Sequence, residues 1–343
     1  MWRTADTGRS GSSADRTVPL YRYIEKAVID PFAPAIRQGS FSARFHAPPG
    51  AALHRMKRKE GIFLTTAFSV LGGDTRQTCL VRQLRAAGYY VSAFRVPEVE
   101  DASPDLTACV LPADAIILPM PALRGPDNIR ASGPALHLGE VLDAALPGTW
   151  LCGGMLDLAV TAARRRGLRV FDYAKDEALA LQNAELTAEG ALPILMERLP
   201  RPLAGSRILI AGFGRIGKLL ARKLAACGAE VTVSARKASD LALANLFGYH
   251  REKTGVWRGG LSGFDAIVNT VPSAVFSAAR LPELRQETVL LELASLPGGF
   301  CDAAQAHPGY LAARGLPGRY APDAAAAIIR DAIFRTLSLE GSS

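Results

Sequence analysis

The sequence of 343 residues lacks the features that mark membrane, secreted and metal-binding proteins. No apolar run reaches the roughly 18 residues that a membrane-spanning helix needs, and the N-terminus has no apolar signal segment. The five cysteines are far apart, form no C-x-x-C motif and have no histidines at metal-ligand spacing. We therefore expect free thiols, no bound metal, no membrane contact and a cytoplasmic location.

Outside the N-terminal segment, basic residues hardly outnumber acidic ones. The formal net charge is +8, but residues 1–60 hold 11 Lys and Arg against 5 Asp and Glu, a net +6, which leaves +2 for the rest. A nearly neutral body excludes an extended basic groove as the working surface, so we expect no nucleic-acid partner. Residues 1–60, rich in Ser, Arg, Pro and Gly, are predicted to be a flexible extension, with Met56 as an alternative start site.

Short apolar runs alternate with helical patterns from residue 61 onward. This alternation requires crossover connections, which produce a parallel sheet with helices on both faces. The pattern occurs twice, and a helix of about residues 175–199, stopped by Pro200 and Pro202, lies between the two runs. We predict an α/β fold with two parallel-sheet domains, residues 61–185 and 186–320, and a cleft between them.

The run ILIAGFGRIG at residues 208–217 places Gly212, Gly214 and Gly217 in G-x-G-x-x-G spacing directly after an apolar strand. A helix and a second strand, AEVTVSA, follow within about 30 residues. The first glycine permits a tight turn, the second lets the backbone approach a pyrophosphate, and the third lets helix and strand pack closely. Residues 186–320 are therefore predicted to be a Rossmann NAD(P)-binding domain. The rest of its cofactor-binding loop is Phe213, Arg215 and Ile216.

The end of the second strand of this domain decides between NAD and NADP. An Asp or Glu there binds the ribose 2′-hydroxyl of NAD, but this sequence has Ser234, Arg236 and Lys237, with no carboxylate before Asp240. Guanidinium and ammonium groups pair with a 2′-phosphate, which a carboxylate would repel. We predict NADP as the cofactor, with NAD as the alternative if Arg236 and Lys237 form an ordinary solvated turn.

Two further polar segments end apolar strands of the second domain. One closes FDAIVNT and the other follows ETVLLEL, so both fall at the carboxyl edge of the sheet, where ribose and nicotinamide are expected. We predict that they contact the cofactor rather than serve only as turns. The predicted contacts are Asn269, Thr270, Pro272 and Ser273 in the first segment, and Ala294 and Ser295 in the second.

A set of segments in fixed order carries a family resemblance. They are VLGGDTRQ at residues 70–77, DAIILPMP, the NAELTAEGA helix, ILIAGFGRIGKLLARKL, FDAIVNTVPS, LELASLPGG and GLPGRYAPDAAA. With these segments the chain resembles the A subunits of dipicolinate synthase over about residues 66–338. The combination of GGDxRQ with ASxPGG and GLPG is more particular to this family than the glycine loop. Glu292 stands where the family is expected to have Asp, so we assign residue 292 no catalytic role.

The resemblance implies an enzyme of sporulation that oxidises dihydrodipicolinate to dipicolinate (pyridine-2,6-dicarboxylate) and passes hydride to a nicotinamide cofactor. It also implies that the partner is the flavoprotein-like B subunit of the synthase, and that both are located in the mother cell of a sporulating bacterium. We further expect a homo-oligomer. A wider similarity to the D-2-hydroxy-acid dehydrogenases predicts that the C-terminal helix, residues 321–343, packs back on the first domain.

A dicarboxylate substrate needs cations and N–H donors in its site. Arg76 follows the first strand and is predicted to hold a substrate carboxylate at the sheet edge, oriented by Asp74 and helped by the Gln77 amide. The alternative is that Arg76 is a surface residue paired with Asp74. Arg319, beside GLPG, is a second candidate carboxylate anchor.

The helix between the domains concentrates polar residues that should border the cleft. Asn183 and Thr187 are predicted to bind substrate, and Glu189 to accept the proton that leaves with the hydride, a structural role at the domain hinge being its alternative. Thr187 and Glu189 lie two residues apart and cannot share a helix face, so only one of them should meet substrate. None of the five histidines lies in these segments or has a partner that marks a base. The candidate catalytic residues are therefore Glu189, Arg76 and Asp74.

Two other functions fit parts of this sequence. An NADP-dependent dehydrogenase of a 2-hydroxy or 2-amino acid would keep the fold, but its usual catalytic His with a supporting carboxylate is not found. A catalytically inactive NADP-binding regulatory module is the second alternative. The intact glycine pattern and the several polar loops argue against it.

Overall fold

The computed structural model describes residues 66–339. The predictions of a flexible extension over residues 1–60 and of a start at Met56 lie outside these residues. No helix of the described part is long and apolar enough to cross a membrane. All five cysteines lie in this part of the chain and none forms a disulfide.

The first sheet has five parallel strands in the order β2-β1-β3-β7-β8. All five residues of β1 are buried, as expected of a central strand covered on both faces. Alternate residues serve opposite faces: Phe68 joins the core under α2 and α10, whereas Leu71 joins the core under α3, α4 and α5. The strands are β1 (Ala67–Leu71), β2 (Tyr90–Phe94), β3 (Ala115–Ile117), β7 (Trp150–Gly153) and β8 (Arg169–Asp172); the helices are α2 (Thr75–Ala86), α3 (Leu106–Val110), α4 (Leu138–Ala144) and α5 (Asp157–Arg165).

A small antiparallel ribbon of three strands is inserted between β3 and α4. It consists of β4 (Leu123–Arg124), β5 (Asn128–Ile129) and β6 (Leu136–His137), in the order β4-β5-β6. Ile129 and Leu136 are buried in the core under α4 and α5. The ribbon is therefore fixed to the first lobe, by which we mean the five-stranded sheet with the helices that cover it. Strands of two residues have no hydrophobic periodicity, and for this reason the ribbon was not predicted.

The second sheet has six parallel strands in the order β11-β10-β9-β12-β13-β14, which is the Rossmann order. Helix α7 buries Leu220, Ala221 and Leu224 against this sheet. The strands are β9 (Arg207–Ala211), β10 (Glu230–Ala235), β11 (His250–Lys253), β12 (Ala266–Asn269), β13 (Val289–Glu292) and β14 (Tyr310–Ala312); the helices are α7 (Arg215–Ala226) and α8 (Ala238–Leu246). The predicted fold class is confirmed.

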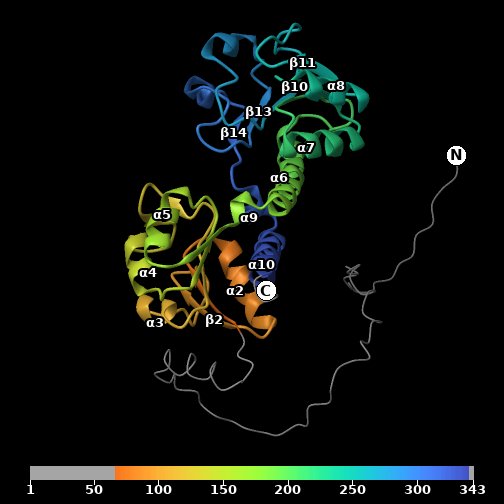
Figure 1. Ribbon diagram of the computed structural model, residues 1–343. Coiled ribbons are helices and arrows are strands. Elements are labelled where there is room, and N and C mark those ends of the chain that lie inside the picture. The colour runs from red at the N-terminus through yellow and green to blue at the C-terminus, as the bar shows by residue number, and fades with distance from the viewer. Residues whose placement is uncertain (1–65, 340–343) are drawn as a thin grey trace, which may run out of the picture. The chain divides into compact units, whose positions relative to one another are not determined.

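Three helices connect the two sheets. Helix α6 (Glu177–Arg198), capped by Asp176, contributes Leu179 to the first core and Leu195 to the second, so the predicted domain boundary at residues 185–186 falls inside it. Helix α9 (Leu316–Tyr320) packs on α6, and α10 (Pro322–Leu339) lies beside α2 in the first lobe (Figure 1). Short 3-10 helices cover Tyr173–Lys175, Ala278–Glu283 and Asp302–Ala306.

Candidate active site

The three glycines of the loop after β9 have different surroundings. Gly212 has φ of 99°, and a side chain there would collide with Thr270. A side chain at Gly217 would collide with the carbonyl oxygen of Gly212, so this glycine lets α7 approach β9. No atom of residues 66–339 lies within 4 Å of the position that a Cβ of Gly214 would take. The space in front of Gly214, at the N-terminus of α7, is thus free for a pyrophosphate.

Two cavities adjoin this loop and share Gly214 and Thr270. One, of about 270 Å³, lies beside the end of β10; the other, of about 280 Å³, lies against α6. Predicted cofactor residues line both cavities. Those in the first cavity are Gly212, Phe213, Gly214, Arg236, Lys237, Thr270, Pro272 and Ser273. Those in the second cavity are Gly214, Arg215, Ile216 and Thr270, and the predicted substrate residue Asn183 lies there with them. The two cavities therefore offer adjacent compartments on either side of the glycine loop, as a dinucleotide requires.

The cavity beside β10 contains both cations predicted to bind a 2′-phosphate. Arg236 and Lys237 are exposed in it. Asp240 also lines this cavity, but its carboxylate lies 3.9 Å from the Lys218 ammonium, which offsets its charge. Ser234 does not line it, because its hydroxyl is buried and donates to Thr254 Oγ1 at 2.9 Å.

The segments after β12 and β13 are joined by a buried carboxylate. Glu292 accepts hydrogen bonds from Asn269 Nδ2 at 2.7 Å, from the backbone N–H of Ala294 at 3.0 Å and from that of Gly299 at 2.8 Å. Asn269 is itself fully buried and also donates to the Val271 carbonyl. These hydrogen bonds fix the conformation of the loops that follow β12 and β13. Ser295 is exposed in the second segment.

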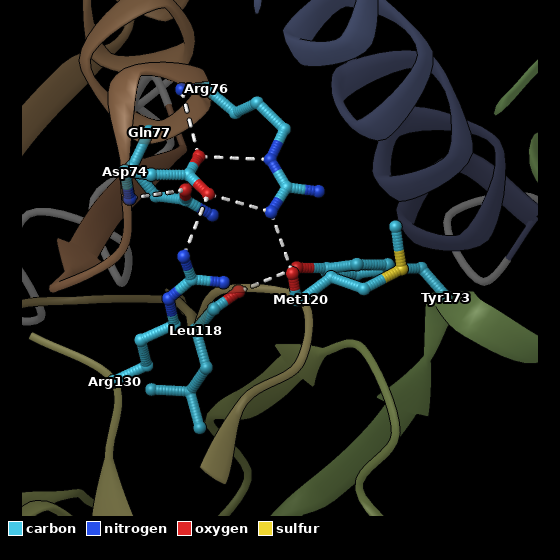
Figure 2. A network of polar contacts seen from close by, with 7 residues as sticks. All are labelled: Asp74, Arg76, Gln77, Leu118, Met120, Arg130 and Tyr173. Carbon is cyan, nitrogen blue, oxygen red and sulfur yellow. Dashed lines mark hydrogen bonds and ion pairs between the residues drawn. The ribbon is translucent and has the colours of Figure 1, made fainter. Parts of the chain in front are cut away.

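Figure 2 shows the polar network at the start of α2, where Asp74 and Arg76 are paired. Arg76 Nε and Nη2 donate to the two carboxylate oxygens of Asp74 at 2.9 and 2.8 Å, and Nη2 also donates to the Met120 carbonyl at 2.7 Å. The Arg76 side chain is only 6% exposed. Nearby, the buried Tyr173 hydroxyl donates to the Leu118 carbonyl at 2.6 Å, which fixes the strand end that carries Met120. Arg76 is therefore a buried residue, not a surface one.

Asp74 and Arg76 each stabilise the charged form of the other. Burial by itself raises the pKa of Asp74, but the hydrogen bonds and charge of Arg76, with the charge of Arg130, outweigh it, so the pKa lies below the ordinary 3.8. Burial lowers the pKa of Arg76, and the Asp74 carboxylate more than compensates, so this pKa lies above its ordinary value. Both groups stay charged at neutral pH.

Arg130, in the ribbon, is a candidate site residue that the sequence analysis missed. Its Nη2 lies 3.7 Å from Asp74 Oδ2, and its side chain is 33% exposed. Its backbone is held against the loop after β1, because Gly73 N–H donates to the Arg130 carbonyl at 2.7 Å. A Cβ on Gly72 would lie 2.5 Å from the same carbonyl oxygen. Gly72 thus makes room for the ribbon, a long-range reason that no local pattern reveals, whereas a Cβ on Gly73 would collide with the Gln77 side chain.

Gln77 lies beneath this loop and is completely buried. Its Oε1 accepts a weak hydrogen bond from the Asp74 N–H at 3.4 Å, which closes the capping box of α2. Its Nε2 has no hydrogen-bond partner among the described residues. A buried amide donor without an acceptor is costly, and it marks a place where a bound ligand or water would complete the structure.

The remaining candidate site residues, Thr187, Glu189 and Arg319, do not form one cluster. Thr187 is buried, and its hydroxyl donates to the Asn183 carbonyl one turn back at 2.8 Å. Glu189 accepts from the Tyr320 hydroxyl at 3.2 Å, lies 3.8 Å from the Lys223 ammonium, and lines neither cavity at the glycine loop. Arg319 is exposed on α9.

One histidine does have an acidic partner, contrary to the sequence analysis. His137 Nδ1 lies 3.0 Å from Asp127 Oδ2, and both side chains are about half exposed. Asp127 also accepts from the Gly139 N–H at the start of α4. The pair therefore holds the ribbon to this helix end. The partner was missed because it lies ten residues away across a ribbon that the sequence did not predict.

The comparisons with known proteins agree for both lobes. Residues 67–174 match the family model described as the N-terminal domain of the dipicolinate synthase A subunit, and residues 201–302 match a model of NAD(P)-binding domains. The A subunit of dipicolinate synthase from Bacillus subtilis (strain 168) is 28% identical over 287 residues, which cover 79% of this chain and 95% of that protein.

Solved structures give the same result. The A subunit of dipicolinate synthase from Bacillus halodurans superposes with a TM-score of 0.69 at 25% identity, covering 81% of this chain and 99% of that chain. A transhydrogenase from Sinorhizobium meliloti has a TM-score of 0.58 at 14% identity, covering 80% of this chain and 94% of its own, which is a likeness of fold alone.

A Rossmann sheet with an open glycine loop, joined to a second parallel sheet, defines a protein of the NAD(P)-binding class. Within that class, this chain is similar over most of its length to the A subunits of dipicolinate synthase, as its motifs predicted.

Proposed function

We propose that this chain is the dehydrogenase of dipicolinate synthesis, which oxidises dihydrodipicolinate to dipicolinate with NADP. The observation that carries the proposal is the group formed by Asp74, Arg76 and Arg130 in the lobe that matches the family model. One carboxylate between two guanidinium groups leaves a net charge of +1, and a dicarboxylate substrate supplies acceptors for the donors that remain.

The reaction removes one hydride and one proton from the dihydropyridine ring, which leaves the aromatic dicarboxylate. The nicotinamide of NADP, when bound, supplies the hydride acceptor. In this proposal Arg236 and Lys237 hold the 2′-phosphate, and the loop from Gly212 to Gly217 holds the pyrophosphate at the start of α7. Asn183 borders the nicotinamide side, since it lines the cavity against α6.

The proton goes to water in this proposal. Glu189, the acceptor predicted from the sequence, is engaged with Tyr320 and Lys223. The proton does not need a strong base, because the aromatic product is much more stable than the dihydropyridine. The group around Arg76 then acts by binding and orienting the substrate.

The test is direct synthesis of the product. The purified chain, with and without a B subunit, is mixed with the product of dihydrodipicolinate synthase and NADP, and the ultraviolet absorbance of the pyridine ring is followed. We expect dipicolinate and NADPH to form in equal amounts. No dipicolinate with both subunits present would refute the proposal, and NADP binding without turnover would favour an inactive regulatory module.

A further inference from the structure

Arg76 has little capacity left for a ligand. A guanidinium has five N–H donors, and three of them are used: Nε–H and one hydrogen of Nη2 by Asp74, and the other hydrogen of Nη2 by the Met120 carbonyl. Only Nη1 has no partner among the described residues. A two-pronged grip on a carboxylate needs two neighbouring nitrogens, so Arg76 cannot provide one without giving up Asp74 or Met120.

Arg130, unlike Arg76, has most of its hydrogen-bond donors left for a ligand. Its guanidinium is half-buried, and its interaction within the described residues is the 3.7 Å ion pair with Asp74, which is too long for a hydrogen bond. Its donors are therefore free for a ligand. Its backbone is fixed at both polar groups, since its N–H donates to the Ala122 carbonyl at 3.1 Å and its carbonyl accepts from Gly73.

The buried amide of Gln77 adds a donor that a ligand or a water molecule at this place would satisfy. Nε2 is a donor without an acceptor, and Gln77 is completely buried. Figure 2 shows the side chains of Gln77, Arg76 and Arg130 grouped around the Asp74 carboxylate. Because Asp74 already accepts from Arg76 through both oxygens, an added anion would be the natural acceptor for the donors that are left.

We propose that Arg130 is the residue that grips one carboxylate of the substrate and selects a dicarboxylate over a monocarboxylate, while Arg76 is a positioning residue. Arg76 holds Asp74 in place through two hydrogen bonds, and Asp74 attracts the Arg130 guanidinium through the 3.7 Å ion pair. This inference rests on the proposed function for the identity of the substrate. It assigns the choice of substrate to a side chain of the ribbon.

The test compares two stable ligands that differ by one carboxylate, pyridine-2,6-dicarboxylate and pyridine-2-carboxylate. Their dissociation constants are measured by calorimetry on the full-length chain in the presence of NADPH, for the wild type and for Arg130→Gln, Arg130→Lys and Arg124→Gln. Arg124 is an exposed arginine of the same ribbon and serves as the matched control. Thermal unfolding of each variant verifies that it is folded.

We expect Arg130→Gln to weaken binding of the dicarboxylate by roughly 10- to 100-fold and to leave binding of the monocarboxylate nearly unchanged, because a charged hydrogen-bonded pair is lost for one ligand only. Arg130→Lys should restore part of the discrimination, and Arg124→Gln should behave as wild type. If Arg130→Gln folds and discriminates between the two ligands as the wild type does, the inference is overturned.

Turnover of dihydrodipicolinate by the same preparations separates this inference from the proposed function. Wild-type turnover with unchanged discrimination in Arg130→Gln overturns the role of Arg130 alone. Binding of the dicarboxylate that depends on Arg130, without any turnover, supports Arg130 and refutes the proposed reaction. A wild-type chain that binds neither ligand and does not turn over dihydrodipicolinate overturns both.

Discussion

Gly318 of α9 lies directly against the guanidinium of Arg76, and a Cβ at residue 318 would be 2.9 Å from Arg76 Nε. This contact joins two of the segments that carry the family resemblance, GGDxRQ and GLPG. The helix that carries GLPG covers the buried arginine. The glycine is required here for space, because Arg76 is fixed by three hydrogen bonds and cannot move aside at low cost.

Gly318→Ala should therefore be destabilising, by about 1–3 kcal/mol, the usual cost of overfilling a packed site. Denaturant unfolding measures it. Gly139→Ala is the control, since Gly139 lies in α4 and no atom of the described part of the chain is within 4 Å of its Cβ position. Alanine there should be neutral or slightly stabilising. Equal effects of the two substitutions would show that the Arg76 contact does not matter.

Arg76→Ala should weaken substrate use and leave NADP affinity nearly unchanged. The substitution leaves Asp74 without its main partner and should lower the free energy of unfolding by about 3 kcal/mol. We expect KM for the dihydropyridine to rise at least about tenfold, and the effects of Arg76→Ala and Arg130→Gln on KM to be less than additive, because both act through Asp74. An equal loss of NADP affinity would show that the loop after β1 has been assigned to the wrong ligand.

The cofactor preference depends on Arg236 and Lys237. Replacing both by alanine should raise Kd for NADP by roughly 10- to 100-fold and change Kd for NAD by less than about twofold, because only NADP has the 2′-phosphate. Fluorescence titration of the reduced cofactors gives both constants. Arg222→Ala, an exposed arginine on α7, is the control. A wild-type preference for NAD would contradict the assignment.

Stability in acid should depend on Asp74. Its pKa is depressed in the folded state, so its stabilising contribution is complete above the unfolded pKa of about 3.8 and is lost as the pH falls through the lower folded pKa. Asp74→Asn should remove about 3 kcal/mol at pH 7 and much less near pH 2. Asp323→Asn, which removes an exposed ion pair with Arg82, should change the free energy of unfolding by less than about 1 kcal/mol at both pH values. A constant difference for Asp74→Asn across this range would contradict the assignment.

Glu189 can be tested for the role of proton acceptor. Its carboxylate contacts Tyr320 and Lys223, so we expect Glu189→Gln to change kcat by less than about twofold. The negative charge of Glu189 raises the pKa of Tyr320, and the variant should return this pKa toward its ordinary value of 10, which ultraviolet titration against the wild type detects. A fall in kcat of about 100-fold or more at unchanged KM would instead establish Glu189 as the acceptor.

The sequence predicted those parts of the molecule that are local in the chain. The glycine loop was correctly recognised because strand, turn and helix follow one another within residues 207–226. Ser234 shows the limit of this reasoning. The position was expected to face the cofactor, but β10 is covered on both faces, and a buried hydroxyl in such a strand bonds to its neighbour, here Thr254.

The position of Arg130 could not be predicted for a different reason. It depends on the contact between Gly72, Gly73 and the ribbon, which are more than fifty residues apart, and on strands too short to leave a pattern. The hydrogen-bonded burial of Arg76 could likewise not be predicted from the sequence, because the Met120 carbonyl that accepts from it lies after a different strand. The predicted role of Asp74 in orienting Arg76 agrees with the geometry, since both of its oxygens accept from that guanidinium.

The ribbon of β4, β5 and β6 places Arg130 on a segment that is not part of either parallel sheet. In evolutionary terms this separates what must be conserved from what can diverge. If Arg130 grips the substrate as proposed, substitutions at this one position alter the ligand that is recognised while the sheet, the glycine loop and the cofactor chemistry are inherited intact. Relatives that share the fold but act on other acids should therefore differ first in this ribbon, and exchanging it between them is the shortest route to a new specificity.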